Sequence, residues 1–132
     1  MNTKLLLTAS AIFLGLMGIS LSFMPGEILE KLLLETNQTS ALIMQLLGAL
    51  FLGFGLMNWM AKGSIIGGIY NKPLVIGNLM HFGVGAITLL KIAFNLKASK
   101  EFLIPLTIIY SVFALTFFYV FSRNPKAVKK TS

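Results

Sequence analysis

Four side chains with polar atoms lie inside apolar stretches of this chain and are the best placed to do chemistry there: Asn58, Trp59, Asn78 and His81. His81 is the only histidine, and its imidazole could handle protons or ligate a haem iron. The alternative is structural, because a neutral imidazole bonded to Asn58 or Asn78 would join two helices. If the cluster does more than that, it predicts a ligand site.

Metal binding and hydrolysis have little support in the sequence. A zinc site needs three or four protein ligands, and His81 has no Cys, Asp or Glu near it in its stretch. The chain has no cysteine, which excludes disulfides and thiol catalysis. All four acidic residues lie outside the apolar stretches, so paired catalytic carboxylates are not expected within them. We expect no metal, no catalytic residue and no enzyme activity.

Gln45 and Lys91 form a second candidate site, an outer polar pair. Lys91 could bind an anionic group, or it could extend its amine to the membrane interface. Gln45 has a comparable depth on the neighbouring stretch and could hydrogen-bond to it.

These residues must be positioned by helices, because four long stretches lack Asp, Glu, Lys and Arg altogether: 5–26, 36–61, 73–90 and 102–122. About 20 apolar residues cross the bilayer core as a helix, and the stretches are too long for barrel strands. We predict an all-α fold, a four-transmembrane-helix antiparallel bundle forming one integral membrane domain over 1–132. The predicted spans are 4–24, 40–61, 73–96 and 102–122, with a short amphipathic interfacial helix at 27–35.

The composition and the charges between the spans support this fold and give it an orientation. Hydrophobic residues make up 56% of the chain and charged residues 11%, which excludes an ordinary soluble domain. One side carries seven basic residues and no acidic ones: Lys4, Lys62, Lys72, Arg123, Lys126, Lys129 and Lys130. The spans and the positive-inside rule then predict a multi-pass protein of a cell inner (plasma) membrane, with N- and C-termini cytoplasmic. The basic residues are scattered, so the lipid bilayer and not nucleic acid is the expected partner.

Small residues recur at helical spacing and predict close packing between helices. Those on the packing faces are Ala11, Gly15, Gly18, Gly48, Gly55 and Gly85. The same faces would also suit a homo-oligomer.

The run from Gln45 to Gly55 is rich in glycine and follows a first helix that ends at Met24-Pro25. Together with Asn58-Trp59, Gly77-Asn78 and His81, it resembles uncharacterised bacterial four-helix small membrane proteins, loosely DoxX-like. The resemblance covers the first two helices best. It implies the four-helix fold, a bacterial inner membrane and no particular activity.

Several functions remain open at this point. The chain could be a non-catalytic partner subunit or an assembly or scaffold component, bound to another membrane protein. Alternatively it could bind a hydrophobic ligand, namely a lipid, a quinone or haem, between the second and third spans. A dimeric small-solute transporter is a further alternative. The packing faces favour the partner subunit, which needs no cofactor.

Overall fold

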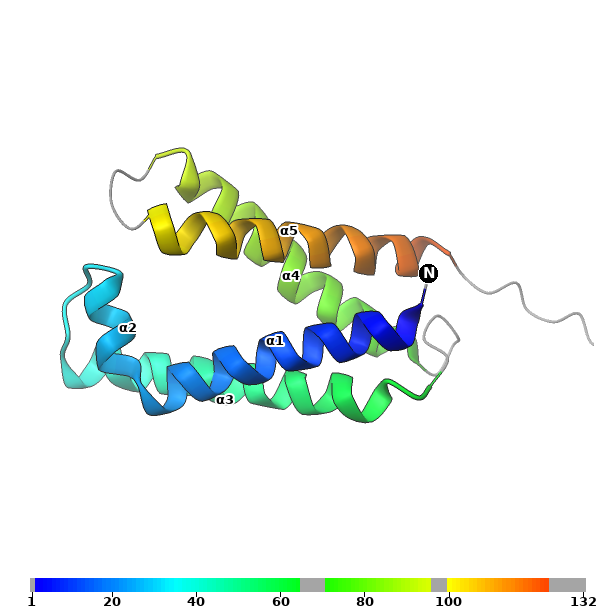
Figure 1. The fold of residues 1–132 in the computed structure, drawn as a ribbon, viewed down its shortest axis with the longest axis horizontal. Helices are drawn as coiled ribbons and strands as arrows, with labels where there is room; N and C mark the ends of the chain where they lie inside the picture. The colour runs from blue at the N-terminus through cyan, green and yellow to red at the C-terminus, as the bar shows by residue number, and fades with distance from the viewer. Residues whose placement is uncertain (1, 65–70, 96–99, 124–132) are drawn as a thin grey trace, which may run out of the picture.

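The computed structural model describes residues 2–64, 71–95 and 100–123. This part of the chain folds into five helices, shown in Figure 1: α1 (Thr3–Phe23), α2 (Pro25–Lys31), α3 (Gln38–Ala61), α4 (Lys72–Ala93) and α5 (Lys100–Ser122). All except α2 are long and apolar enough to cross a membrane. The all-helical fold and the short helix between the first two spans are therefore confirmed.

The break between α1 and α2 follows from local chemistry. Met24 leaves the helical conformation, with φ −129° and ψ 46°. Pro25 then begins α2, where its missing N–H costs nothing because the first turn has no intrahelical acceptor for it.

The short helix α2 covers Pro25–Lys31 and not the predicted 27–35. Leu33 ends it by adopting a left-handed conformation, with φ 57°. The Leu34 N–H then donates to the Leu29 carbonyl at 2.9 Å, which satisfies one of the last carbonyls of the helix. The amphipathic pattern continues past this point, so it could not predict where the helix stops.

The long helices differ from the predicted spans by a few residues at their ends. α3 begins at Gln38, because Asn37 and Ser40 form a capping box: Asn37 accepts from the Ser40 N–H at 2.9 Å, and Ser40 Oγ accepts from the Asn37 N–H at 3.0 Å. α5 begins at Lys100 and not at 102, so two charged residues lie in its first turn. α4 ends at Ala93, three residues before the predicted end, which itself lies outside the described residues.

The long helices form two pairs. α1 packs along α3, and α4 packs along α5, while α2 contacts both members of the first pair. The α1–α3 crossing is close: a Cβ atom added to Gly18 would lie 2.9 Å from the Gly48 carbonyl oxygen, and one added to Gly48 would lie 2.9 Å from that of Gly18. A Cβ on Gly55 would lie 3.2 Å from the Ala11 carbonyl oxygen. Such small residues let two backbones approach in lipid.

Aromatic side chains join the two pairs. Phe13 of α1 reaches across to Phe82 of α4 and to Tyr110 and Phe113 of α5, with ring centroids 6.4, 5.9 and 5.8 Å apart. Phe82 also stacks on Phe117 at 5.8 Å, and both are fully buried. This cluster lies near the middle of the bundle. Toward the start of α1 and the end of α5 the two pairs pack against one another, and Leu7, Leu14 and Val75 are buried there.

Candidate functional site

Asn58 and Asn78 form a reciprocal amide pair. Each Nδ2 donates to the other side chain's Oδ1 at 2.7 Å. Asn58 also donates to Ser10 Oγ at 3.0 Å, and Asn78 donates to the Leu74 carbonyl at 3.0 Å. All three of these polar side chains are fully buried. The pair therefore joins α3 to α4, with Ser10 tying in α1, and its hydrogen-bonding groups are engaged within the protein.

Trp59 lies apart from the amide pair. Its side chain is exposed, and the Lys62 amine lies 3.0 Å from the ring centroid, a cation–π contact. The indole thus lies at the end of α3, on the outer surface.

His81 contacts neither asparagine through a hydrogen bond. Its Nε2 lies 3.2 Å from the hydroxyl oxygen of Tyr110, a buried residue of α5. Sequence reasoning missed this partner, although a signal existed: Tyr110 is the only one of the three tyrosines that lies in the middle of a predicted span. The His81–Tyr110 pair joins the two members of the α4–α5 pair.

Aromatic rings hold His81 in place. The imidazole stacks on Phe54 with centroids 5.5 Å apart and an interplanar angle of 25°, and it meets Phe51 edge to face at 5.0 Å. The Tyr110 ring packs directly against Gly85 of α4, since a Cβ on Gly85 would lie 2.5 Å from Tyr110 Cε1. Only a glycine at position 85 leaves room for the tyrosine ring beside α4.

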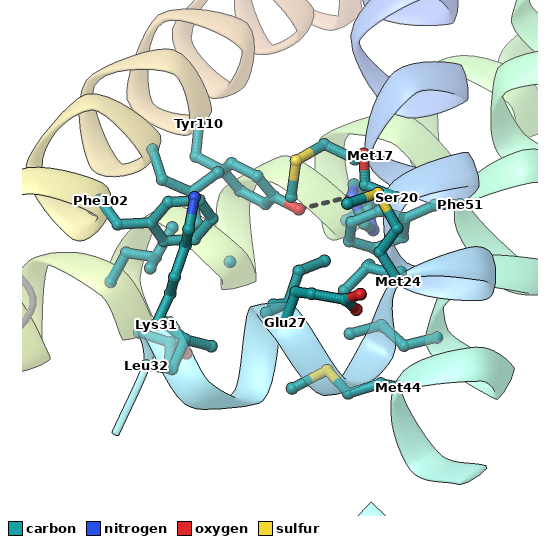
Figure 2. Close-up of a pocket in the computed structure, with 18 residues that line it drawn as sticks. Met17, Ser20, Met24, Glu27, Lys31, Leu32, Met44, Phe51, Phe102 and Tyr110 are labelled. Atoms are coloured by element: carbon teal, nitrogen blue, oxygen red, sulfur yellow. Dashed lines mark hydrogen bonds between the residues drawn. The ribbon is translucent and has the colours of Figure 1, made fainter. Parts of the chain in front are cut away.

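A cavity of about 690 Å³ begins at the His81–Tyr110 pair and lies between the two helix pairs. Figure 2 shows side chains from all five helices around it, with the Tyr110 hydroxyl bonded toward His81. Its walls are mainly apolar, from Met17, Leu21, Met44, Leu47, Phe51, Leu89 and Leu106. The polar lining consists of Ser20, Thr88 and the His81–Tyr110 pair, together with Glu27 and Lys31 on α2.

Every helix contributes to the cavity from the same end of the bundle. The lining residues of the long helices lie between the middle of the bundle, where Phe51, His81 and Tyr110 are found, and the end that carries α2. His81 is nine residues into α4 and Tyr110 ten residues into α5, so both lie about 14–15 Å along their helices. That is about half of a bilayer core. The cavity therefore occupies one half of the spanning region, and the asparagine pair lies in the other.

Gln45 and Lys91 are exposed and are not joined by any hydrogen bond that the described residues show. Gln45 Nε2 donates instead to the Ser22 carbonyl of α1, at 3.5 Å. Lys91 lies in the last turn of α4, where a cation is favoured near the helix carbonyls. Neither residue lines the cavity.

Within the described residues, no group of three or more His, Cys, Asp or Glu side chains could hold a metal ion. The arrangement around His81 can do two things chemically: it can enclose an apolar body, and it can offer hydrogen bonds at one end of it.

The comparisons with known proteins give no family. No protein-family description matches the chain, and no curated protein or solved structure is similar to it. The likeness to DoxX-like proteins therefore stays a prediction. What the helices establish by length and composition is a small multi-pass membrane protein.

Proposed function

We propose that this protein binds one hydrophobic or amphiphilic molecule of the membrane in the cavity between its two helix pairs. The observation that carries the proposal is the cavity itself. Its volume of about 690 Å³ falls in the range of about 300–1,000 Å³ that is usual for small-molecule sites. Mainly apolar walls with a few polar groups are also typical of such sites.

The cavity does not result from loose packing throughout the protein. The same chain brings the α1 and α3 backbones together at Gly18 and Gly48 and fully buries Phe82 and Phe117. Open space between helices forfeits dispersion contacts that a filled core would make. A guest molecule that occupies the cavity would supply those contacts.

The binding role is proposed without catalysis. The site that we infer differs from the predicted cluster: His81 remains in it, while Asn58 and Asn78 hold helices together and Trp59 lies at the surface. A lipid or a quinone would need only the cavity. Haem would need an iron ligand, and His81 Nε2 is engaged with Tyr110.

Native mass spectrometry of the protein released from lipid nanodiscs tests the proposal. The wild type should retain one bound lipid-sized molecule. Ser20→Trp places an indole in the cavity and should abolish retention, whereas Ala9→Trp, the matched control on the exposed surface of α1, should not. Equal retention by the two variants would refute binding in the cavity. Haem would appear as a Soret band in the absorption spectrum of the same sample.

A partner subunit is the second candidate function, and one observation favours it. Ala49 and Gly53 are exposed on α3, and a Cβ on Gly53 would meet nothing within 4 Å. Such a small-xxx-small face admits a further helix, from another membrane protein or a second copy. Gly53→Leu should abolish co-purification of that partner. Gly83→Leu, an equally open glycine on α4, should leave it intact.

We also propose a bacterial inner membrane with both termini in the cytoplasm. The orientation is supported by the clustering of Lys4, Lys62, Lys72 and Arg123 at the end of the bundle opposite α2. The bacterial membrane rests on the resemblance alone. Three of these cations lie over aromatic rings: Lys62 over Trp59, Arg123 over Tyr119 at 4.8 Å, and Lys72 over Phe121 at 5.9 Å. Pairs of this kind are typical of the membrane interface.

A further inference from the structure

The His81–Tyr110 pair has a fixed hydrogen-bonding capacity, which limits what can bind beside it. A neutral imidazole carries one N–H and a phenol carries one O–H, so the pair holds two donors. The contact of 3.2 Å between Nε2 and the hydroxyl oxygen uses only one of them. If Tyr110 donates to Nε2, the His81 Nδ1–H remains. If Nε2–H donates to Tyr110, the phenol O–H remains. Either tautomer therefore leaves one donor for a third group.

The spare donor is accessible from the cavity. Both residues line the cavity, and Figure 2 shows the Tyr110 hydroxyl among the lining side chains. Because both side chains line the cavity, the unused donor can be offered to a ligand there.

The surroundings favour a neutral group at this position. Phe51, Leu106 and Met17 lie around the inner part of the cavity, while the charged lining residues Glu27 and Lys31 belong to α2. Figure 2 shows these two side chains extending from α2 toward the space between the helix pairs. A charged ligand group beside His81 would lie half a bilayer deep without a counter-ion, which is costly.

The two side chains of the pair are also fixed in position before a ligand binds. Phe54 stacks on the imidazole, and Gly85 gives the Tyr110 ring its place against α4. A bond to these groups would lose little side-chain entropy, since they are already ordered.

We propose that the cavity selects a long-chained neutral amphiphile whose carbonyl or hydroxyl oxygen accepts a hydrogen bond from the His81–Tyr110 pair, with its chain directed toward α2. This inference rests on the proposed binding function and names its ligand class. A plain acyl chain entering from the α2 end would bring a methyl group to the pair and leave the donor unmatched. An oxygen at the inner end supplies the acceptor. An unmatched polar group in an apolar site is the larger penalty, so it sets the selectivity.

Three photoactivatable C16 probes with the same mid-chain diazirine test this class: a primary alcohol, a methyl ketone and the plain hydrocarbon. Each is titrated into nanodiscs that contain the full chain, and labelling of the α1 and α5 peptides at the cavity is measured by mass spectrometry. The alcohol and the ketone should half-saturate the site at a mole fraction on the order of tenfold below that of the hydrocarbon. A preference between them separates a hydroxyl ligand from a carbonyl ligand.

Two variants locate the effect. His81→Phe/Tyr110→Phe removes both donors, because either residue alone would still offer one, and it should abolish the preference for the oxygenated probes while still binding all three. Tyr119→Phe is the matched control, because Tyr119 is exposed on the same helix as Tyr110 and does not line the cavity. It should keep the wild-type preference.

The outcomes separate the two proposals. If the hydrocarbon binds the wild type as tightly as the alcohol and ketone, or if His81→Phe/Tyr110→Phe keeps the preference, the ligand class is overturned and the binding cavity stands. If none of the probes labels cavity residues in the wild type, the proposed function fails as well. The wild-type comparison does not depend on the folding of any variant.

Discussion

Asn58 and Asn78 donate to each other's side-chain oxygens at the same distance, 2.7 Å, and so connect the α1–α3 pair with the α4–α5 pair. With Ser10 as a third member, the network has no polar atom left over among the described buried side chains. In lipid such a network stabilises a particular pairing of helices, because every broken bond leaves an amide in an apolar surrounding.

Replacing one asparagine alone should therefore lower the free energy of unfolding by more than half of the effect of replacing both. Asn78→Leu leaves the Asn58 amide without its main partner and should lower the free energy of unfolding by about 1–3 kcal/mol. The double variant Asn58→Leu/Asn78→Leu should cost less than the sum of the single changes. Steric trapping in bicelles measures these values. Strict additivity of the two changes would contradict a shared bond.

The glycines of α3 should differ in their tolerance of alanine. A Cβ on Gly48 would lie within 3 Å of backbone atoms of α1, and one on Gly55 would lie 3.1 Å from the Gly15 nitrogen. A Cβ on Gly53 meets nothing within 4 Å. We expect Gly48→Ala to destabilise most, Gly55→Ala less, and Gly53→Ala to be neutral or stabilising by up to about 1 kcal/mol, from helix propensity alone. Thermal unfolding in one detergent compares them; a cost at Gly53 equal to that at Gly48 would be evidence against the α1–α3 crossing.

Replacing Leu33 with glycine should stabilise the protein. Its φ of 57° lies in the left-handed region, which costs a leucine about 1–2 kcal/mol, and its side chain is exposed. Leu33→Gly should raise the free energy of unfolding by up to about 1 kcal/mol, whereas Leu34→Gly, the neighbouring control, should not. Chemical denaturation measures the difference. A loss of stability in Leu33→Gly would mean that the side chain has a packing role in the membrane.

Orientation can be tested with single cysteines, since the chain has none of its own. In intact cells, a membrane-impermeant maleimide should label Thr39→Cys, at the start of α3, and not Ser122→Cys, at the end of α5. Permeabilised cells should label both, which controls for reactivity. Labelling of Ser122→Cys alone from outside would reverse the proposed orientation.

The spans could be predicted from the sequence because their signal is local. An unbroken run of uncharged residues identifies a transmembrane helix wherever the helix packs. Asn58 lies four residues before Lys62 and Asn78 six residues after Lys72, which predicts similar depths for the two asparagines. The structure brings their side chains together. The predicted helix ends were less accurate. Lys100 and Glu101 are charged and were therefore left out of the predicted span, yet they lie in the first turn of α5.

The cavity and the partner of His81 could not be predicted in this way. Tyr110 lies 29 residues from His81 on another helix, and spacing within one helix says nothing about which neighbour it will face. The space between the helix pairs depends on how two independent pairs diverge, which is a property of tertiary packing. Only the mid-span position of Tyr110 pointed to a buried role.

Because the cavity is confined to the α2 end, the two ends of the protein differ in their access to a ligand. Beyond the aromatic cluster around Phe13 and Phe82 the bundle is packed closed, with Phe117 and the Asn58–Asn78 pair filling its interior. Among the described residues, the cavity extends from the His81–Tyr110 pair toward α2, so a guest would enter it from the monolayer that surrounds α2. Lipids of the other monolayer would first have to flip across the bilayer, so occupancy of this site would report the composition of a single leaflet.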